Sequence, residues 1–413
     1  MNAPFVSLTA ALCLAGLAAF GQPVGALPKL PDPSGPFRIG RIGYDWVDQS
    51  RTEPYSSDRK AHRELMVYFW YPVSAKSADA RGPYMPGAQR MDTLPDIRKS
   101  MSRVFGRNWA AITSGAIFSH AIDSAPVSKA VQRFPMVIFS HGLGSPGFSY
   151  TCLLEDLVSR GYVVASIEHT YIASAGWFPD GRVVPRLTEN PPAGLSSEER
   201  FKWTTARTTE EISEGAADVR FVLDQITTRS GNPEQFLLAG RLDLNRVAAM
   251  GHSAGAEFAA RACQLDRRFK ACVDLDGAMV PLAALPEFPD GALLEQPLLF
   301  LEAHHPESQM AGTTAEHALY FKKKEEQLQS LYPGSYAVAL ISPGVAHPSF
   351  SDIPLLFAGT DGFPETSVVV HNLDRIEQYV REFLGKELNR KKAPLLDSGR
   401  SNSWEATVKR YGR

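Results

Sequence analysis

Short apolar runs alternate with segments of helical period through the centre and the C-terminal part of the chain. The runs are almost entirely apolar, which is typical of strands buried on both faces, whereas the longer segments repeat apolar side chains at helical spacing. The predicted strands are residues 136–140, 162–166, 246–250, 271–275, 297–301 and 336–341. The predicted helices are residues 148–160, 211–227, 254–263, 313–331 and 375–384. This alternation predicts an α/β fold, with a mostly parallel central sheet and helices on both faces.

The segments outside these elements have other patterns. Residues 37–47 and 65–71 are rich in aromatic and β-branched side chains and are predicted as two further strands. Residues 75–132 mix Gly and Pro with short helical patterns, which indicates a surface insertion. Residues 171–208 hold no long apolar period and are predicted as a second insertion, in the form of a loop or cap.

The N-terminus carries an apolar run over residues 5–21, followed by small residues up to Ala26. The run is short for a membrane span, and small residues just before Leu27 are typical of a signal-peptidase site. No Lys or Arg precedes the run, so the α-amine alone supplies positive charge there. We expect residues 1–26 to be a signal peptide cleaved near Ala26 and the protein to be secreted or periplasmic. An uncleaved anchor is the alternative.

The overall composition is that of a globular protein, because the 413 residues are 44% hydrophobic and 21% charged. Lys and Arg number 43 against 45 Asp and Glu, for a formal net charge of −2, so we expect no nucleic-acid surface. One α/β domain over residues 27–388 with two insertions is the simplest division of this length. Residues 389–413 are expected to be a basic, loosely held tail.

The cysteines indicate neither a disulfide framework nor a metal site. Cys13 lies in the predicted signal peptide, which leaves Cys152, Cys263 and Cys272. This is an odd number without metal-ligand spacing. Cys263 and Cys272 could form a bridge, but buried free thiols are favoured.

The segment Gly251-His252-Ser253-Ala254-Gly255 matches the pattern G-x-S-x-G, and it lies between a predicted strand and a predicted helix. That context is the nucleophile elbow of α/β-hydrolases, in which a tight turn exposes the serine hydroxyl beside the N–H groups of a helix N-terminus. Glycines are needed there because side chains would collide with neighbouring elements. Ser253 is therefore predicted to be a nucleophile. The alternative is a glycine-bracketed turn with an incidental serine.

A second glycine-rich segment, residues 140–144 (SHGLG), follows the predicted strand 136–140. A loop in this place contributes an N–H group to the oxyanion hole of such enzymes. We predict the N–H groups of Leu143 and Ala254 as the two donors. His141 could be a base, but it precedes Ser253 in the chain, so we expect it to support the loop instead.

The base is expected downstream of Ser253, because the acid and then the histidine follow the serine in this fold. The downstream histidines are His304, His305, His317, His347 and His371. Only His347 stands in a loop after the final predicted strand, and it is the predicted base. The pair at 304 and 305 has no further ligands at useful spacing, so no metal site is expected. His252 is expected to point its side chain away from Ser253.

Two acidic residues fit the third position of the triad. Asp276 follows the predicted strand 271–275, and Glu302 follows the predicted strand 297–301. Asp274 is close to Asp276 but lies inside its strand. The pattern alone favours Asp276 only slightly over Glu302.

Four motifs in this order resemble the platelet-activating-factor acetylhydrolase family, the plasma-type lipoprotein-associated phospholipase A2. They are VIFSHGLGSPGFSY, GHSAG, LDGAMVPL (275–282) and GVAHPSFSD (344–352). The resemblance spans about residues 37–385 and implies an α/β-hydrolase fold with Ser253 as nucleophile, Asp276 as acid and His347 as base. It also implies Leu143 and Ala254 at the oxyanion hole. Ala256 departs from the glycine usual in the family, and the two insertions do not match clearly.

The resemblance further implies hydrolysis of short or oxidised acyl chains at the sn-2 position of phospholipids, without calcium. We therefore expect a secreted serine carboxylic-ester hydrolase that works through an acyl-enzyme and needs no metal or organic cofactor. A general carboxylesterase or polyester hydrolase is the near alternative, and a non-catalytic binding protein on a hydrolase scaffold is a remote one. Tyr171, Trp177 and Phe178 could line a pocket, touch a lipid surface transiently or pack in the core. No stable protein partner is implied.

Overall fold

A computed structural model of the chain describes residues 27–74, 80–277, 294–303, 333–360, 362–398 and 405–411. Its strands are β1 (Arg38–Thr52), β2 (His62–Val73), β3 (Ala121–Asp123), β4 (Phe134–Ser140), β5 (Val163–Glu168), β6 (Ala175–Trp177), β7 (Val183–Pro185), β8 (Leu242–His252), β9 (Phe269–Leu275), β10 (Leu298–Ala303), β11 (Ser335–Leu340) and β12 (Ala406–Tyr411). Its helices are α1 (Ala88–Met91), α2 (Pro95–Phe105), α3 (Asn108–Thr113), α4 (Thr151–Ser159), α5 (Ser197–Arg229), α6 (Ala254–Leu265), α9 (Ile353–Phe357), α10 (Thr366–Asn389) and α11 (Pro394–Asp397), with 3₁₀ turns η1 (Gly147–Tyr150) and η3 (His347–Phe350).

Ten strands form one sheet in the order β12-β11-β10-β9-β8-β4-β5-β2-β1-β3. In this order, the neighbouring strands β11, β10, β9, β8, β4 and β5 are parallel to one another. In contrast, β2 pairs antiparallel with β1 and β5. The predicted α/β fold with a mostly parallel sheet is confirmed. Parallel strands end at one sheet edge, so the loops after β4, β8, β9 and β11 meet there.

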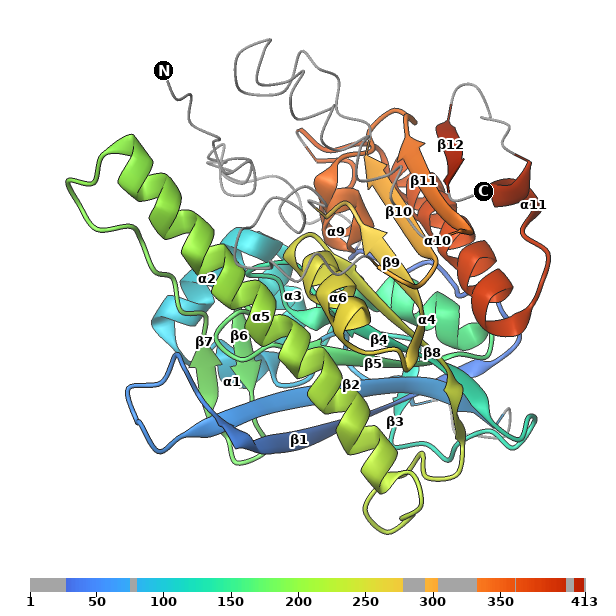
Figure 1. Cartoon of the computed structure of the whole chain (residues 1–413), viewed down its shortest axis with the longest axis horizontal. Coiled ribbons are helices and arrows are strands. Elements are labelled where there is room, and N and C mark those ends of the chain that lie inside the picture. The colour runs from blue at the N-terminus through green and yellow to red at the C-terminus, as the bar shows by residue number, and fades with distance from the viewer. Residues whose placement is uncertain are drawn as a thin grey trace.

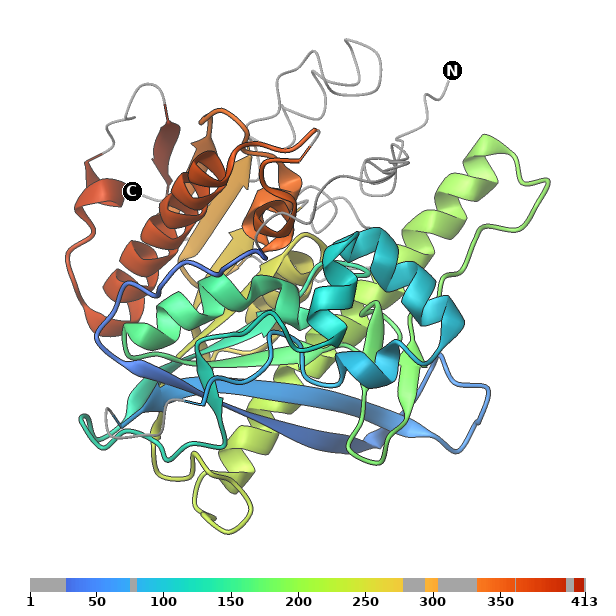
Figure 2. The same cartoon turned by 180° about the vertical axis from the view of Figure 1, so that it is seen from behind.

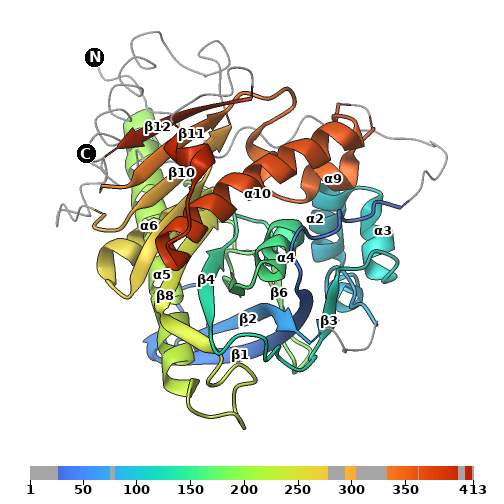
Figure 3. The same cartoon turned by 90° about the vertical axis from the view of Figure 1, so that its right-hand side faces the viewer.

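Helices cover both faces of the sheet, because its central strands are apolar on both. In β4, Val137 and Phe139 pack into one core and Met136 and Ile138 into the other. The α5 and α6 helices lie on one face (Figure 1), and α4 and α10 lie on the opposite face (Figure 2). Figure 3 shows the strands between these two helix layers.

The α5 helix begins at Ser197 rather than at the predicted residue 211. The prediction of a loop or cap is therefore wrong for residues 197–208. A capping box starts the helix: the Ser196 hydroxyl accepts the Glu199 N–H (3.2 Å), and the Ser196 N–H donates to the Glu199 carboxylate (2.9 Å). This first part of the helix projects from the body (Figure 1), which is why its sequence lacks an apolar period.

The C-terminal tail is not loosely held over residues 405–411. These residues include β12, which pairs antiparallel with β11 at the edge of the sheet. Ala406 and Val408 are buried, and buried Glu405 forms an ion pair with Arg375 (2.7 Å). The prediction failed because it weighed the positive charge of the tail and not the open edge that β11 presents.

The segment 75–132 is less superficial than predicted over its described part. The α2 helix buries Ile97, Met101 and Phe105, and the Asn108 side chain donates to the carbonyl of Leu356 (2.5 Å) in α9. The helices α2 and α3 therefore pack beside the segment that follows His347.

Several further expectations can be compared with the structure. Cys152, Cys263 and Cys272 are buried free thiols, as predicted. Phe178 is fully buried in the core, which excludes it from a lipid surface, while Tyr171 and Trp177 are half-buried. The predicted signal peptide, the predicted helix 313–331 and His304, His305 and His317 lie outside the described residues. Within the described residues, no helix has the length and apolar character that a membrane span requires.

Candidate active site

Ser253 lies in a strained turn between β8 and α6. Its backbone has φ 55° and ψ −127°, a conformation that costs a non-glycine residue about 1–3 kcal/mol. A side chain on Gly251 would overlap the carbonyl of Gly255, and one on Gly255 would overlap the carbonyl of Ser140. The turn therefore needs both glycines, which explains the motif and holds the Ser253 hydroxyl at the sheet edge.

His347 and Asp276 come together at the same edge from the loops after β11 and β9. The His347 Nδ1 lies 2.6 Å from Oδ2 of Asp276, and the Ala303 N–H donates to Oδ1 (2.8 Å). The Asp276 side chain is only 5% exposed, whereas that of His347 is 41% exposed. Since an ionised carboxylate can only accept, Nδ1 carries the hydrogen, and Nε2 is the ring atom that can take a proton.

Glu302 is not placed like Asp276, although both were candidates for the acid. The β10 strand runs through Ala303, so Glu302 lies within the strand, opposite Ala339 of β11. Asp276 instead follows the end of β9 with φ 52°, and its N–H donates to the carbonyl of Leu301 (2.8 Å). This turn aims the Asp276 carboxylate at the histidine loop.

The glycine-rich loop after β4 lies beside Ser253, because a Cβ on Gly142 would lie 3.3 Å from the Cβ of Ser253. Its N–H groups on either side of Leu143 are used inside the protein. The Gly142 N–H donates to the Tyr150 hydroxyl (3.0 Å), and the Gly144 N–H donates to the carbonyl of Ile172 (3.0 Å). Among the described residues the Leu143 N–H has no hydrogen-bond acceptor, so it is available to a ligand.

Ala254, the other predicted donor, is the first residue of α6. The N–H groups of a first helical turn have no acceptor within their own helix. Leu143 and Ala254 therefore lie in the two segments that adjoin Ser253, the glycine-rich loop and the start of α6.

The side chain of His252 contacts the histidine loop. Its ring lies 4.6 Å from that of His347 between centroids, and its Nε2 lies 3.1 Å from the His347 carbonyl. The carbonyl can only accept, so Nε2 carries the hydrogen and Nδ1 accepts from the Tyr150 hydroxyl (2.8 Å). Burial lowers the pKa of His252 to about 3, so the ring is neutral.

Tyr150 was not identified from the sequence, and it completes a chain of hydrogen bonds across the site. The Gly142 N–H donates to its hydroxyl, the hydroxyl donates to His252, and His252 donates to the carbonyl of His347. One buried chain thus ties the glycine-rich loop to the histidine loop. The only signal in the sequence is a tyrosine at the start of a predicted helix, which is too common to find it.

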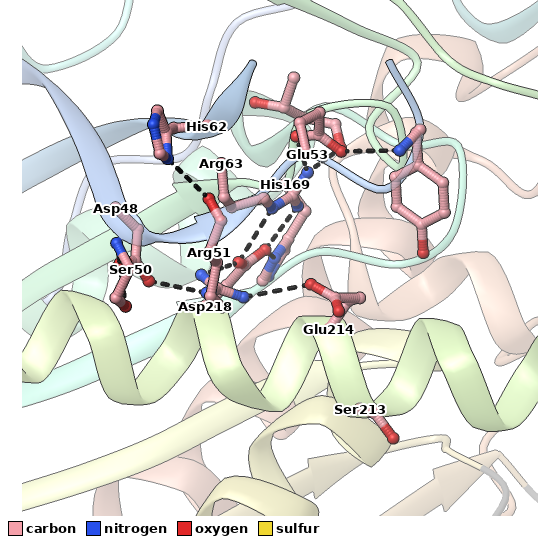
Figure 4. Close-up of polar contacts among 12 residues, drawn as sticks. Asp48, Ser50, Arg51, Glu53, His62, Arg63, His169, Ser213, Glu214 and Asp218 are labelled. Carbon is pink, nitrogen blue, oxygen red and sulfur yellow. Dashed lines mark hydrogen bonds and ion pairs between the residues drawn. The ribbon is translucent and has the colours of Figure 1, made fainter. Parts of the chain in front are cut away.

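A second buried network supports the glycine-rich loop, and Figure 4 shows the part of it around His169 and Asp218. The His169 N–H donates to Nε2 of His141 (3.2 Å), whose Nδ1–H donates to the carbonyl of Gly142 (2.9 Å). Burial lowers the pKa of His141 to about 3, so His141 is a neutral support and not a base, as expected. His169 in turn donates to Asp218 of α5 (2.9 Å).

Ser140, His169 and Asp218 repeat the residue types and the hydrogen-bond order of a catalytic triad. The His169 Nε2 lies 3.0 Å from the Ser140 hydroxyl. All three residues are fully buried, with 0% of their surface exposed, so a substrate cannot reach them. This set is therefore structural.

Two arginines neutralise the buried Asp218 carboxylate. Arg63 binds it through two nitrogens, at 3.0 and 2.6 Å, and Arg51 binds it at 2.7 Å. Burial by itself raises the pKa of Asp218, but Arg63, His169 and Arg51 outweigh it and hold the pKa well below its ordinary value.

Replacing Asp218 with Asn is expected to lower the free energy of unfolding by about 3 kcal/mol or more, because it leaves the Arg63 charge buried without a full partner. The ionised carboxylate contributes stability above about pH 4, and this contribution is lost as the pH falls. The difference between the two proteins should therefore narrow below about pH 4. Urea unfolding at several pH values measures it.

The matched control is Glu214→Gln, on the same helix, where a half-buried glutamate pairs with Arg51 at 3.2 Å. We expect this change to cost about 1 kcal/mol or less. Equal losses in the two variants would contradict the structural role given to Asp218.

No group of three or more His, Cys, Asp or Glu side chains within the described ranges is arranged to hold a metal ion. The pair Asp276 and His347 is engaged with itself and with Ala303. The site as described holds a serine hydroxyl, a histidine paired with a carboxylate, and backbone amides.

Comparisons with known proteins agree with this geometry. The chain is 28% identical over 222 residues to a platelet-activating factor acetylhydrolase of Cavia porcellus, covering 50% of this chain and 48% of that protein. It is 22% identical over 400 residues to a probable 1-alkyl-2-acetylglycerophosphocholine esterase of Arthroderma benhamiae, covering 89% and 90%. The matched part thus spans about half the length of the guinea-pig relative and most of the fungal one.

Among solved structures, a ferulic acid esterase from Streptomyces cinnamoneus is similar, with a TM-score of 0.68 and 26% identity over 93% of this chain and 100% of that one. A family model described as platelet-activating factor acetylhydrolase, isoform II, matches residues 25–360. This match covers most of the chain and confirms the resemblance carried by the four motifs. The chain belongs to the platelet-activating factor acetylhydrolase, isoform II family.

Proposed function

We propose that this protein is a serine esterase that hydrolyses short acyl esters of glycerophospholipids, with Ser253 as nucleophile, His347 as base and Asp276 as acid. The observation that carries the proposal is the strained Ser253 elbow at the sheet edge where Asp276 holds His347 at 2.6 Å. The phospholipid part rests on the relatives, one of which is named for 1-alkyl-2-acetylglycerophosphocholine.

The proposed cycle is acyl transfer in two halves. His347 Nε2 takes the Ser253 proton as the serine oxygen attacks the ester carbonyl, and Asp276 stabilises the charged imidazole. The N–H groups of Leu143 and Ala254 hold the oxyanion, an effect worth about 3 kcal/mol per donor. The bond to the leaving alcohol then breaks, and His347 returns the proton to it. Water repeats these steps on the acyl-enzyme and releases the carboxylic acid.

A general carboxylesterase is the second candidate, favoured by the likeness to a ferulic acid esterase over 93% of this chain. The test is a panel of p-nitrophenyl esters against short-chain sn-2 phospholipids, with a fluorophosphonate label on the folded protein. We expect a Ser253 adduct and a higher kcat/KM for the phospholipids. A preference for aromatic esters would favour the second candidate, and the absence of an adduct would leave only a binding protein.

Export is part of the proposal, and it rests on the apolar run at residues 5–21 and the small residues up to Ala26. Exported protein should begin near residue 27, which intact-mass measurement checks. A substrate that gathers in membranes would also bring transient contact with a lipid surface, which co-sedimentation with phosphatidylcholine vesicles tests.

Replacing Tyr150 with Phe is expected to lower kcat by about 10- to 100-fold with little change in KM. The change leaves the Gly142 N–H and the His252 Nδ1 buried without their partner, so the oxyanion loop and the base loop lose their common support. Steady-state kinetics on a p-nitrophenyl ester measure it. The control is Tyr162→Phe, which removes a hydrogen bond to Asn389 (2.8 Å) on another part of the molecule. Equal kcat in the two variants would contradict the role of the chain.

A further inference from the structure

The side chain of Arg186 lies against the loop that we propose to bind the substrate oxygen. Arg186 follows β7, and its backbone N–H donates to the carbonyl of Ser174 (3.2 Å). The Gly144 N–H donates to the carbonyl of Ile172 (3.0 Å), two residues away from Ser174. Residues 172–174 therefore accept backbone hydrogen bonds both from Arg186 and from the glycine-rich loop.

Gly144 is the point of contact. A Cβ on this glycine would lie 2.6 Å from Nη1 and 3.4 Å from Cζ of Arg186, and the glycine has a positive φ of 73°. The turn thus favours glycine at this position, and the guanidinium of Arg186 lies directly against it. Leu143 is the neighbouring residue, so the guanidinium lies within about 8 Å of its Cα.

The guanidinium of Arg186 is half-buried and has no acceptor among the described residues. Its Nε is buried without a hydrogen-bond partner, and no ion pair within the described ranges involves it. Burial lowers its pKa from the ordinary value, and Glu211 is the carboxylate whose charge acts against this. Glu211 itself pairs with Arg207 at 3.6 Å. A partly desolvated cation without a partner is unfavourable until an anion joins it.

The neighbouring arginines are paired. Arg182 in the same β6–β7 hairpin binds Glu64 (2.7 Å) and Asp180 (2.5 Å). Arg207 at the base of the projecting part of α5 binds Glu189 (3.2 Å) as well as Glu211. Arg186 therefore differs from these two arginines, because no carboxylate among the described residues pairs with its guanidinium and it is left to bind an anionic ligand.

We propose that Arg186 binds the phosphate of a glycerophospholipid substrate and so sets the preference of the site for phosphate-bearing esters. This inference rests on the proposed function. In such a substrate the phosphate is attached to the glycerol carbon next to the one that carries the acyl ester. It therefore lies a few bonds from the ester carbonyl, whose oxygen is proposed to accept the Leu143 N–H. A guanidinium presents several donors in a planar fork that matches phosphate oxygens.

The experiment compares 1-alkyl-2-acetylglycerophosphocholine with 1-alkyl-2-acetylglycerol, both with short alkyl chains and below their aggregation concentrations. Arg186→Gln is expected to lower kcat/KM for the phosphate ester about 10- to 100-fold more than for the neutral one, mainly through KM. Arg186→Lys should recover part of the loss, because it keeps the charge and loses the fork. Raising the salt concentration should weaken the preference of the wild type and not that of Arg186→Gln.

Arg182→Gln is the matched control, because it makes the same change of charge in the same hairpin, and it should leave the ratio between the two esters unchanged. An equal loss on both esters in Arg186→Gln would mean that the guanidinium only supports the oxyanion loop, and it would overturn the inference. A loss confined to a third ester, with a carboxylate at the end of its acyl chain, would place the anion on the acyl group and overturn it as well. If the wild type hydrolyses none of the esters and takes no fluorophosphonate label, the proposed function itself fails.

Discussion

Replacing Ser253 with Ala is expected to lower kcat for ester hydrolysis by about 10⁵- to 10⁶-fold and to abolish the fluorophosphonate adduct. The alanine methyl has no oxygen with which to form the acyl-enzyme. The turn holds residue 253 at a positive φ whether it is serine or alanine, so we expect the fold to change little. Thermal unfolding checks this expectation. Stopped assays with high enzyme concentration measure the residual rate.

Ser213→Ala serves as the control, since Ser213 is an exposed residue of α5 whose hydroxyl donates to the carbonyl of Thr209 (2.8 Å). It should retain wild-type activity and labelling. Hydrolysis by Ser253→Ala at more than a few per cent of the wild-type rate would contradict the nucleophile assignment, provided that contamination by another esterase is excluded by repurification.

Replacing Asp276 with Asn is expected to lower kcat by about 10⁴-fold. An amide in this place can still accept the Ala303 N–H, but its other atom becomes a donor toward His347. The histidine is then held in the wrong tautomer, with the hydrogen on Nε2, and it cannot take the Ser253 proton. Steady-state kinetics over a pH series measure the loss, and thermal unfolding shows whether the fold is kept.

Glu302→Gln is the decisive companion, because Glu302 was the rival acid in the sequence pattern. Glu302 lies within β10, opposite Ala339, and we expect the variant to keep near-normal turnover. Near-normal turnover in Asp276→Asn together with loss of activity in Glu302→Gln would reverse the assignment of the acid.

The central strands and the nucleophile elbow were predicted well because they follow from the local sequence pattern. Short apolar runs such as residues 136–140 and 271–275 are typical of central strands, and both are strands of the parallel sheet. The elbow could be located for the same reason, because the G-x-S-x-G residues stand between a strand and a helix.

Where the prediction failed, the cause was a contact between distant parts of the chain. The tail was expected to be loose, yet its Ala406 and Val408 complete the edge beside β11. The projecting first part of α5 was expected to be a loop, because a solvent-exposed helix has no apolar period in its sequence. Its capping box was nevertheless present in the sequence.

Local pattern along the chain was thus sufficient for the fold class, for the position of Ser253 and for the loops that carry Leu143 and His347. It left Asp276 and Glu302 nearly equal, because each follows a strand as predicted from the sequence, and only the folded chain shows that β10 runs on through Glu302 while Asp276 turns toward His347. The roles of Tyr150 and His252 likewise arise only when three loops meet at one edge. A hydrogen bond between residues that lie far apart in the chain leaves no period or spacing in the sequence, so these parts of the site required the folded molecule.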